Sequence, residues 1–203
     1  MAGGRTEFSP DRTDVRSFYK LLTAVVVPRP IAWVSSTSAA GVDNLAPHSF
    51  FTVSCVDPPV VQFTSVGRKD TLNNVEATGE FVVSLAPEPL FERINATSTD
   101  FPPGISEFDA AGVARESSAL VKPPRVAASP VALECRLHST LRLGDCTVVF
   151  GRVLLAAIAA DVLVDGHPDI GRLKPLARLG RNEWSTIGEV REIARVRYRD
   201  LPT

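Results

Sequence analysis

Apolar and polar residues alternate in short runs over residues 28–65, and this stretch carries the clearest structural pattern of the chain. Three runs rich in β-branched and aromatic residues, each bounded by turn formers, are typical of short strands: residues 31–36, 50–54 and 60–64. The Asp57-Pro58-Pro59 break cannot continue a strand ladder, because proline has no N–H to donate. Residues 44–49 interrupt the sheet pattern with polar groups and a proline, so we expect this segment to form the rim of a pocket.

Beyond this stretch the pattern predicts more short strands and a few short helices. Further strands are predicted over residues 24–27, 80–85 and 131–138, with one long or two shorter strands over 146–164. Within 131–138 the apolar side chains alternate with Glu134, Arg136 and His138, so we expect these three on the opposite face. Short helices are predicted after a cap at Thr13 or Asp14, between Asp70 and Gly79, over 89–97 and over 189–195. Residues 99–124 are predicted to be an irregular excursion that covers an edge or an entrance, or forms a subunit contact.

The helix predicted at Asp70 begins directly after two basic residues, Arg68 and Lys69. A helix N-terminus presents unpaired N–H groups and a partial positive charge. The hydroxyls of Ser65 and Thr71 belong to the same stretch. This junction suits a phosphate group; the alternative is an ordinary capped surface helix with solvated basic side chains.

Composition narrows the class of protein. The chain has 203 residues, of which 44% are hydrophobic and 22% charged, as is typical of a globular protein of this size with a single domain. Since 22 lysines and arginines nearly balance 23 aspartates and glutamates, the charge does not favour nucleic acid or an anionic membrane as a partner. The N-terminus lacks the apolar core of a signal peptide, and the longest apolar run, 153–160, is too short to span a bilayer. We therefore expect a soluble, cytoplasmic protein.

Cysteine and histidine are too sparse for a disulfide framework or a metal site. The cysteines, Cys55, Cys135 and Cys146, contain no C-x-x-C pair, which favours reduced, buried thiols. The three histidines lack the spacing of zinc ligands, so no metal is expected. His48 and Ser49 are a poor catalytic dyad, because neighbouring residues of a strand point to opposite faces. With no evident nucleophile or metal, any reaction needs an organic cofactor.

Several motifs, in order and at matching intervals, resemble those of the flavin reductase-like FMN-binding split-barrel proteins. They are Pro28-Arg29-Pro30-Ile31-Ala32-Trp33-Val34-Ser35-Ser36, Asn44-Leu45-Ala46-Pro47-His48-Ser49-Phe50-Phe51, Asp57-Pro58-Pro59, Lys69-Asp70-Thr71, Ser129-Pro130-Val131 with Glu134-Cys135, Phe150-Gly151-Arg152-Val153 and Arg178-Leu179-Gly180. The chain is similar to the branch that contains flavoredoxins and the reductase components of two-component flavin monooxygenases. The similarity spans residues 14–188, expected to be one domain, with terminal extensions at 1–13 and 189–203. It implies a mainly β fold, a six-stranded antiparallel Greek-key split barrel with short flanking helices, in a homodimer with FMN near the subunit interface.

The resemblance also implies a set of cofactor-binding residues around the rim, the helix start and a C-terminal loop. They are Arg29, Trp33, Ser35, Ser36, Asn44, Leu45, Ala46, Pro47, Ser49, Thr64, Ser65, Lys69, Asp70, Thr71, Arg178 and Gly180. Trp33 is either a core residue or a contact of the flavin ring. Two positions depart from the family pattern: His48 stands where many relatives have an aromatic residue, and Trp184 where a tyrosine is common. His48 and His167 are candidates for a role on the nicotinamide side, with a structural role as the alternative for each.

The activity implied by the resemblance is hydride transfer from NADH or NADPH to FMN, with the reduced flavin supplied to a partner monooxygenase. No side-chain acid or base is required for this step, which agrees with the absence of a catalytic motif. The alternative is a flavoredoxin-like carrier that holds FMN tightly and has little reductase activity. A split barrel that has lost its flavin is disfavoured by the intact motifs at residues 44–47 and 69–71.

Overall fold

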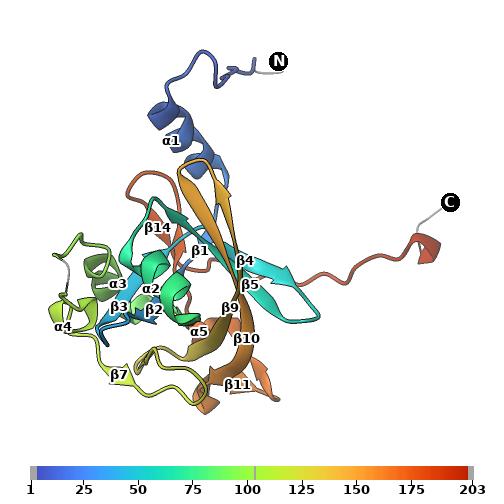
Figure 1. Cartoon of the computed structure of the whole chain (residues 1–203). Helices are drawn as coiled ribbons and strands as arrows, with labels where there is room; N and C mark the ends of the chain where they lie inside the picture. Colours follow the sequence, from blue (N-terminus) through green and yellow to red (C-terminus); the bar gives the residue numbers. More distant parts are fainter. Residues whose placement is uncertain (1–3, 103, 201–203) are drawn as a thin grey trace.

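The computed structural model describes residues 4–102 and 104–200, and one large antiparallel sheet organises them (Figure 1). Its strands, in hydrogen-bonding order, are β3 (Asp43–His48), β2 (Ala32–Thr37), β6 (Glu80–Leu85), β9 (Val131–Leu143), β10 (Cys146–Ile158), β5 (Val60–Val66) and β4 (Phe51–Cys55). The edge strands β3 and β4 are joined by Ser49 and Phe50 alone, so the sheet must curl until its edges approach, and β3 also contacts β5. The predicted mainly β split barrel is therefore confirmed.

The barrel sheet has seven strands where six were expected, because the polar segment at residues 43–48 is itself a strand. Its backbone pairs with β2 along its whole length, from Asp43 opposite Thr37 to His48 opposite Ala32. The prediction that residues 44–49 interrupt the sheet was therefore wrong. Pro47 is tolerated because β3 is an edge strand, where a missing N–H need not break a ladder. The same segment still forms a pocket rim, as described below.

Short strands complete the β structure in three small sheets. They are β1 (Arg29–Pro30), β13 (Ala177–Arg178) and β14 (Trp184–Ser185); β7 (Arg115–Glu116) and β8 (Arg125–Val126); β11 (Leu163–Val164) and β12 (His167–Pro168). The pairing of Arg29 with Arg178 brings residues 149 positions apart in the sequence side by side.

The barrel interior is filled from alternate positions of neighbouring strands. Phe63 and Phe81 are fully buried and meet edge to face, with ring centroids 5.5 Å apart. Along β2, Val34 packs into this interior, whereas Trp33 points to the other face and joins a second apolar cluster with Leu45. Trp33 is fully buried, and its indole N–H donates to the Thr97 hydroxyl at 2.9 Å. Of the two hypotheses for Trp33, the structure supports the core residue.

Gly151 on β10 faces the ring of Phe81, and we expect a methyl group there to be costly. A Cβ atom at Gly151 would lie 2.1 Å from Cζ of the buried Phe81, so the ring would have to move within a filled interior. Gly151→Ala should lower the free energy of unfolding by about 1–3 kcal/mol. Gly188→Ala is the matched control, because no described atom lies within 4 Å of its Cβ position. Urea unfolding that gave both variants the same midpoint would contradict this account.

The helices flank the barrel and are short. They are α1 (Val15–Val25), α2 (Asp70–Thr78), α3 (Phe91–Ala96), α4 (Glu107–Ala110) and α5 (Ile170–Leu173), with 3₁₀ turns at Glu88–Leu90, Ala160–Val162 and Tyr198–Asp200. None of the helices in the described ranges is both long and apolar enough to cross a membrane.

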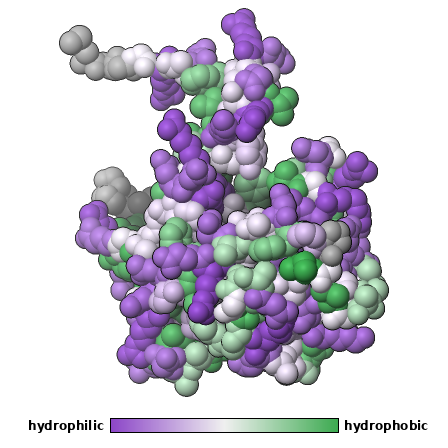
Figure 2. Space-filling view, turned by 90° about the vertical axis from the view of Figure 1, so that its left-hand side faces the viewer, coloured by the Kyte–Doolittle hydropathy of each residue, from purple (hydrophilic) through white to green (hydrophobic). Residues whose placement is uncertain are grey.

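Helix α1 stands out from the barrel at one end of the molecule (Figures 1 and 2). Asp14 caps it by accepting from the Ser17 N–H at 3.0 Å, as predicted. The predicted strand over residues 24–27 was wrong, because the helix runs on to Val25 and the Val26 N–H still bonds to the Leu22 carbonyl. Much of the apolar surface of α1 finds no partner among the described residues, since Val15 is 87% exposed and Val25 71%.

The helix predicted over residues 189–195 was also wrong. No helix or strand forms between β14 and the 3₁₀ turn at Tyr198–Asp200, and this segment leaves the barrel as an extended chain (Figure 1). Val190 is 63% exposed and Ile193 91%, so neither packs against the body. A short helix without tertiary packing is unstable in water, which explains the outcome.

The cysteines occupy different environments, and all three are free. Cys135 is fully buried on β9, and burial raises the pKa of its thiol to about 12. Cys55 and Cys146 are half-buried, so the expectation of buried thiols is met by Cys135 alone.

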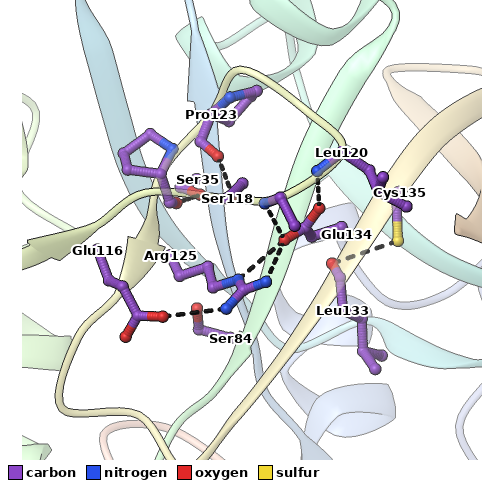
Figure 3. Close-up of polar contacts among 12 residues, drawn as sticks. Ser35, Ser84, Glu116, Ser118, Leu120, Pro123, Arg125, Leu133, Glu134 and Cys135 are labelled. Atoms are coloured by element: carbon purple, nitrogen blue, oxygen red, sulfur yellow. Dashed lines mark hydrogen bonds and ion pairs between the residues drawn. The ribbon is translucent and has the colours of Figure 1, made fainter. Parts of the chain in front are cut away.

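Glu134 on β9 was expected on the outer face with Arg136, but it is fully buried. Its polar contacts are drawn in Figure 3. Its carboxylate accepts from the backbone N–H groups of Ala119 and Leu120 at 2.8 and 2.6 Å, and from Nε and Nη2 of Arg125 at 2.9 and 2.5 Å. The reason is that the loop before β9 folds over this face of the strand. Burial would raise the pKa of Glu134, but the hydrogen bonds from Ala119, Arg125 and Leu120 outweigh it and hold the pKa below its ordinary value.

Candidate functional site

A cavity of about 440 Å³ opens where the end of β3, the start of α2 and the segment after α3 meet. We call it the rim cavity. Its size falls in the range of small-molecule sites. Of the residues implied by the family resemblance, it is lined by Asn44, Ala46, Pro47, Ser49, Thr64, Lys69, Asp70 and Thr71, together with His48. The structure thus brings the polar rim and the helix start, which the resemblance assigns to one cofactor site, to the wall of one cavity.

The start of α2 forms one wall of the rim cavity. The helix begins at Asp70, as predicted, with Lys69 at the N-cap position, and no described side chain caps the helix N-terminus. The first N–H groups of α2 therefore remain available to a ligand. The Lys69 ammonium lies 3.4 Å from Asp100, and because both side chains are largely exposed this ion pair is weak and can open. The predicted stop at Gly79 is confirmed, with φ of +75° in the left-handed region.

A buried hydrogen-bond network fixes the wall between β3 and α2. The Thr71 hydroxyl donates to Oδ1 of Asn44 at 2.8 Å, and Ser36 donates to the same atom at 3.3 Å. The Asn44 amide Nδ2 donates to the Glu107 carboxylate at 2.9 Å. Asn44 and Thr71 are buried, and these bonds engage both the oxygen and the nitrogen of the Asn44 amide. The network makes Asn44 a positioning residue of the cavity wall.

Glu107 on α4 lines the rim cavity and was not found from the sequence. It is 6% exposed, and one carboxylate oxygen accepts from both the Asn44 amide and the Leu45 N–H at 2.9 Å. Arg115 holds α4 against β3, because its guanidinium pairs with Asp109 on α4 and Asp43 on β3 at 2.7 and 3.2 Å. Glu107 belongs to the stretch predicted to cover an entrance. No spacing in the sequence links it to Asn44, since the contact forms only through the fold.

His48 is 9% exposed and lies at the junction of the rim cavity and the barrel interior, with its ring centroid 4.7 Å from that of Phe63. Its Nε2 atom is buried without a hydrogen-bond partner in the described chain. Burial lowers the pKa of His48 to about 4; a backbone hydrogen bond to Thr64 opposes the shift, and the charge of Lys69 adds to it. The imidazole is therefore neutral at neutral pH, and its Nε2 atom is free to bond a group outside the described chain.

The lowered pKa of His48 makes the stability of the protein pH-dependent. In the unfolded chain the histidine takes up a proton near its ordinary pKa of 6.5, but in the folded chain only near pH 4, so its contribution to stability is lost as the pH falls from 6.5 towards 4. Between pH 7 and pH 5 the loss should be about 2 kcal/mol. Urea unfolding at both pH values should show this extra loss in the wild-type protein and not in His48→Phe. Equal losses in both proteins would mean that His48 titrates normally.

A second, larger cavity of about 1050 Å³ adjoins the first and shares Tyr19 and Ser49 with it. It lies between α1 and the loop after β13, and its lining includes Arg29 and Arg178. We call it the arginine cavity. Arg29 donates from Nη2 to the Leu179 carbonyl at 2.7 Å and from Nη1 to the carbonyls of Val26 and Thr23. The structure thus divides the implied cofactor-binding residues between two adjacent cavities.

The other implied residues line neither cavity. Ser35 bonds to the Pro124 carbonyl at 2.5 Å and Ser65 to the Gly67 carbonyl at 2.9 Å, and both are fully buried. Gly180 lies against α1, where a Cβ atom would come within 3.1 Å of Ala24. The set outside both cavities is Trp33, Ser35, Ser36, Leu45, Ser65 and Gly180.

His167, a candidate for the nicotinamide side, and Trp184, which departs from the family pattern, lie outside both cavities. His167 on β12 pairs with Val164 on β11 and lines neither cavity, so its proposed role has no support in the geometry. Trp184 meets Phe91 edge to face at 5.1 Å, and the guanidinium of Arg178 lies 4.8 Å from the centre of its ring. Trp184 therefore packs against Arg178, its partner on the neighbouring strand β13.

Residues 24–170 match the family model described as flavin reductase like domain. A relative from Aquifex aeolicus is 40% identical over 181 residues, which cover 86% of this chain and 92% of the relative. The chain belongs to the flavin reductase-like family.

Solved structures agree with this assignment. Nitrilotriacetate monooxygenase component B from Bacillus cereus is 32% identical, with a TM-score of 0.91 over 95% of this chain and 100% of its own. 2-Nitrobenzoate 2-nitroreductase from Pseudomonas fluorescens is 28% identical, with a TM-score of 0.89 over 98% of this chain and 99% of its own. The resemblance noted in the sequence is therefore confirmed at the level of family and fold.

Proposed function

We propose that this protein is a flavin reductase that binds FMN in the rim cavity and transfers a hydride to it from NADH or NADPH. The observation that carries the proposal is the start of α2, where Lys69 and N–H groups without a side-chain cap border a cavity of about 440 Å³. Membership of the flavin reductase-like family makes a flavin the class of ligand to expect there. The phosphate of FMN is the part that this helix start suits.

The remaining walls of the rim cavity fit the other parts of FMN. β3 is an edge strand, so one row of its backbone N–H and C=O groups is not used by the sheet, and Ala46 and Pro47 place that strand at the cavity. The rim of a flavin ring carries both donors and acceptors. Carbonyl groups of this row can accept from the ring, whereas the Leu45 N–H already donates to Glu107 and Pro47 has no N–H. His48 adds a buried Nε2 atom without a partner in the described chain. These features support the cofactor-binding roles proposed for the residues that line the rim cavity: Asn44, Ala46, Pro47, Ser49, Lys69, Asp70 and Thr71.

When bound, FMN supplies the redox chemistry by accepting a hydride from the nicotinamide. The residues of the chain bind and orient the two reactants, which is a large part of catalysis in such a reaction. Asn44, Thr71 and Glu107 hold the cavity wall rigid through their buried hydrogen bonds. His48 stays uncharged at neutral pH and so does not compete with Lys69 for the negative phosphate.

The proposal includes a homodimer and a partner monooxygenase. The apolar side chains exposed on α1, such as Val15 and Val25, need a second surface, and a copy of the same chain can supply it. The name of the Bacillus cereus relative, a monooxygenase component, supports a role in supplying reduced flavin to such an enzyme. Sedimentation of the purified protein should give twice the mass of one chain.

An anaerobic reduction tests the proposed activity. The protein is loaded with FMN, NADH or NADPH is added, and the visible absorption band of the flavin is followed. Rapid bleaching, and rapid turnover when free FMN is added in excess, are expected of a reductase. Tight binding of FMN without bleaching would overturn the proposal in favour of a flavoredoxin-like electron carrier. Failure to bind FMN would overturn both.

A further inference from the structure

The arginine cavity concentrates positive charge that the proposed FMN site does not use. Five cationic side chains line it: Arg16, Lys20, Arg29, Arg178 and Arg181. None of its described lining residues is an aspartate or a glutamate, and none of the five cations forms an ion pair with a described carboxylate. The chain as a whole carries a net charge of −1, so this imbalance is local. A cavity lined by one sign of charge attracts ligands of the opposite sign.

The contacts of Arg29 show that part of the wall of the arginine cavity is buried and held in place by hydrogen bonds. It is 8% exposed, and three backbone carbonyls fix its terminal nitrogens, whereas its Nε atom is buried with no partner in the described chain. Burial is the main cause that lowers the pKa of Arg29; Tyr19 opposes the shift, and the nearby charge of Arg178 adds to it. The guanidinium groups of the strand neighbours Arg29 and Arg178, one buried and one half-buried, repel each other, and an anion beside them would relieve that repulsion.

The position of the arginine cavity indicates which anion it serves. It shares Tyr19 and Ser49 with the rim cavity, so one extended molecule can occupy both. A nicotinamide dinucleotide has this shape: its nicotinamide must reach the flavin, while its phosphates lie some distance away. NADPH carries a phosphate on the 2′ position of its adenosine ribose that NADH lacks. Dinucleotide sites that take NADH commonly bind the 2′ hydroxyl with a carboxylate, whereas an arginine accommodates the 2′-phosphate.

We infer that the arginine cavity binds the phosphate groups of the nicotinamide co-substrate and selects NADPH over NADH. This inference rests on the proposed reductase function. It gives the five cationic side chains an anionic ligand, the phosphate groups of the co-substrate, which the FMN in the rim cavity does not supply. The absence of a carboxylate from the described lining removes the group that would favour NADH. Arg16 and Arg181 are exposed, so they can contact a ligand without supporting the fold.

The test compares wild-type protein with the double variant Arg16→Gln/Arg181→Gln. Glutamine keeps part of the side-chain length and removes both charges, and neither arginine has a described ion pair to lose. Arg136→Gln is the matched control, because Arg136 is exposed on β9 and lines neither cavity. Three quantities are measured for each protein: affinity for FMN, affinity for adenosine 2′,5′-bisphosphate compared with adenosine 5′-monophosphate, and the rate of anaerobic reduction by NADPH and by NADH.

We expect the wild-type protein and Arg136→Gln to bind the 2′,5′-bisphosphate at least about tenfold more tightly than the monophosphate, and to favour NADPH over NADH by a similar factor. The double variant should lose most of both preferences while its affinity for FMN is unchanged.

Equal binding of the two adenosine phosphates by the wild-type protein would overturn the inference, even if both nucleotides reduce the flavin and the proposed function stands. A double variant that loses affinity for FMN instead would show that the cavity holds the flavin phosphate, and would overturn it too. If neither nucleotide reduces bound FMN, the proposed function fails, and the adenosine phosphate titration still decides whether the cavity recognises a 2′-phosphate.

Discussion

Glu134→Gln should lower the free energy of unfolding by about 3–5 kcal/mol, the largest effect that we expect from a conservative substitution in this protein. The carboxylate is fully buried and accepts hydrogen bonds from two backbone N–H groups and from Arg125. A glutamine in its place has a single acceptor oxygen and turns an amide N–H₂ towards donors. It also leaves the largely buried charge of Arg125 without its main counterion.

Glu116→Gln provides the matched control for this substitution. Glu116 pairs with the same guanidinium at 3.0 Å but is largely exposed, so its loss should cost no more than about 1 kcal/mol. Urea unfolding at pH 7 measures both variants. If Glu134→Gln were as stable as Glu116→Gln, the buried carboxylate would not anchor the loop as the structure indicates.

Because the loop leads back to Arg115 and α4, we also expect Glu134→Gln to weaken FMN binding when the loop detaches.

Lys69→Ala should weaken the binding of FMN by about 10- to 100-fold and leave the binding of riboflavin unchanged. This change in affinity corresponds to the loss of one hydrogen bond to a charged group, which contributes about 1.5–3 kcal/mol to the free energy of binding. Riboflavin lacks the phosphate, so the ratio of the two affinities isolates the interaction at the helix start. Fluorescence titration of the apoprotein with each flavin measures it.

Lys122→Ala is the control for the removal of one positive charge, because Lys122 is exposed and lines neither cavity. It should bind both flavins as the wild-type protein does. An unchanged ratio of FMN to riboflavin affinity in Lys69→Ala would remove Lys69 from the phosphate site. A parallel loss of both flavins would instead show that Lys69 shapes the cavity and does not bind phosphate.

Periodicity predicted the strands of the barrel because their side chains must alternate between a filled interior and an outer face. It failed at β3, where polar residues and Pro47 form an edge strand whose backbone, and not its side chains, holds it in the sheet. It also failed for Glu134, because a loop from elsewhere in the chain covers the face that alternation assigns to solvent. For Glu134 the deciding contact is a loop whose position the strand pattern does not reveal, and for β3 it is the backbone pairing with the neighbouring strand β2.

The candidate site was predicted in part for the same reason. Residues 44–49 and 69–71 were found because each stretch carries its own local mark, a polar break in a strand pattern or a helix start after basic residues. No local sequence pattern distinguishes Glu107. Its place in the cavity depends on Arg115, which holds α4 against β3. The division of Arg29 and Lys69 between two cavities likewise follows from the position of α1 and the loop after β13, which only the fold reveals.

The central claim is that FMN binds in the rim cavity with its phosphate at the start of α2. A crystal structure of the protein with FMN tests it most directly. We expect the phosphate within hydrogen-bond distance of the Lys69 ammonium and of the first backbone N–H groups of α2, and the flavin ring against β3 at residues 46–48. A phosphate placed instead in the arginine cavity, between Arg29 and Arg178, would contradict the account.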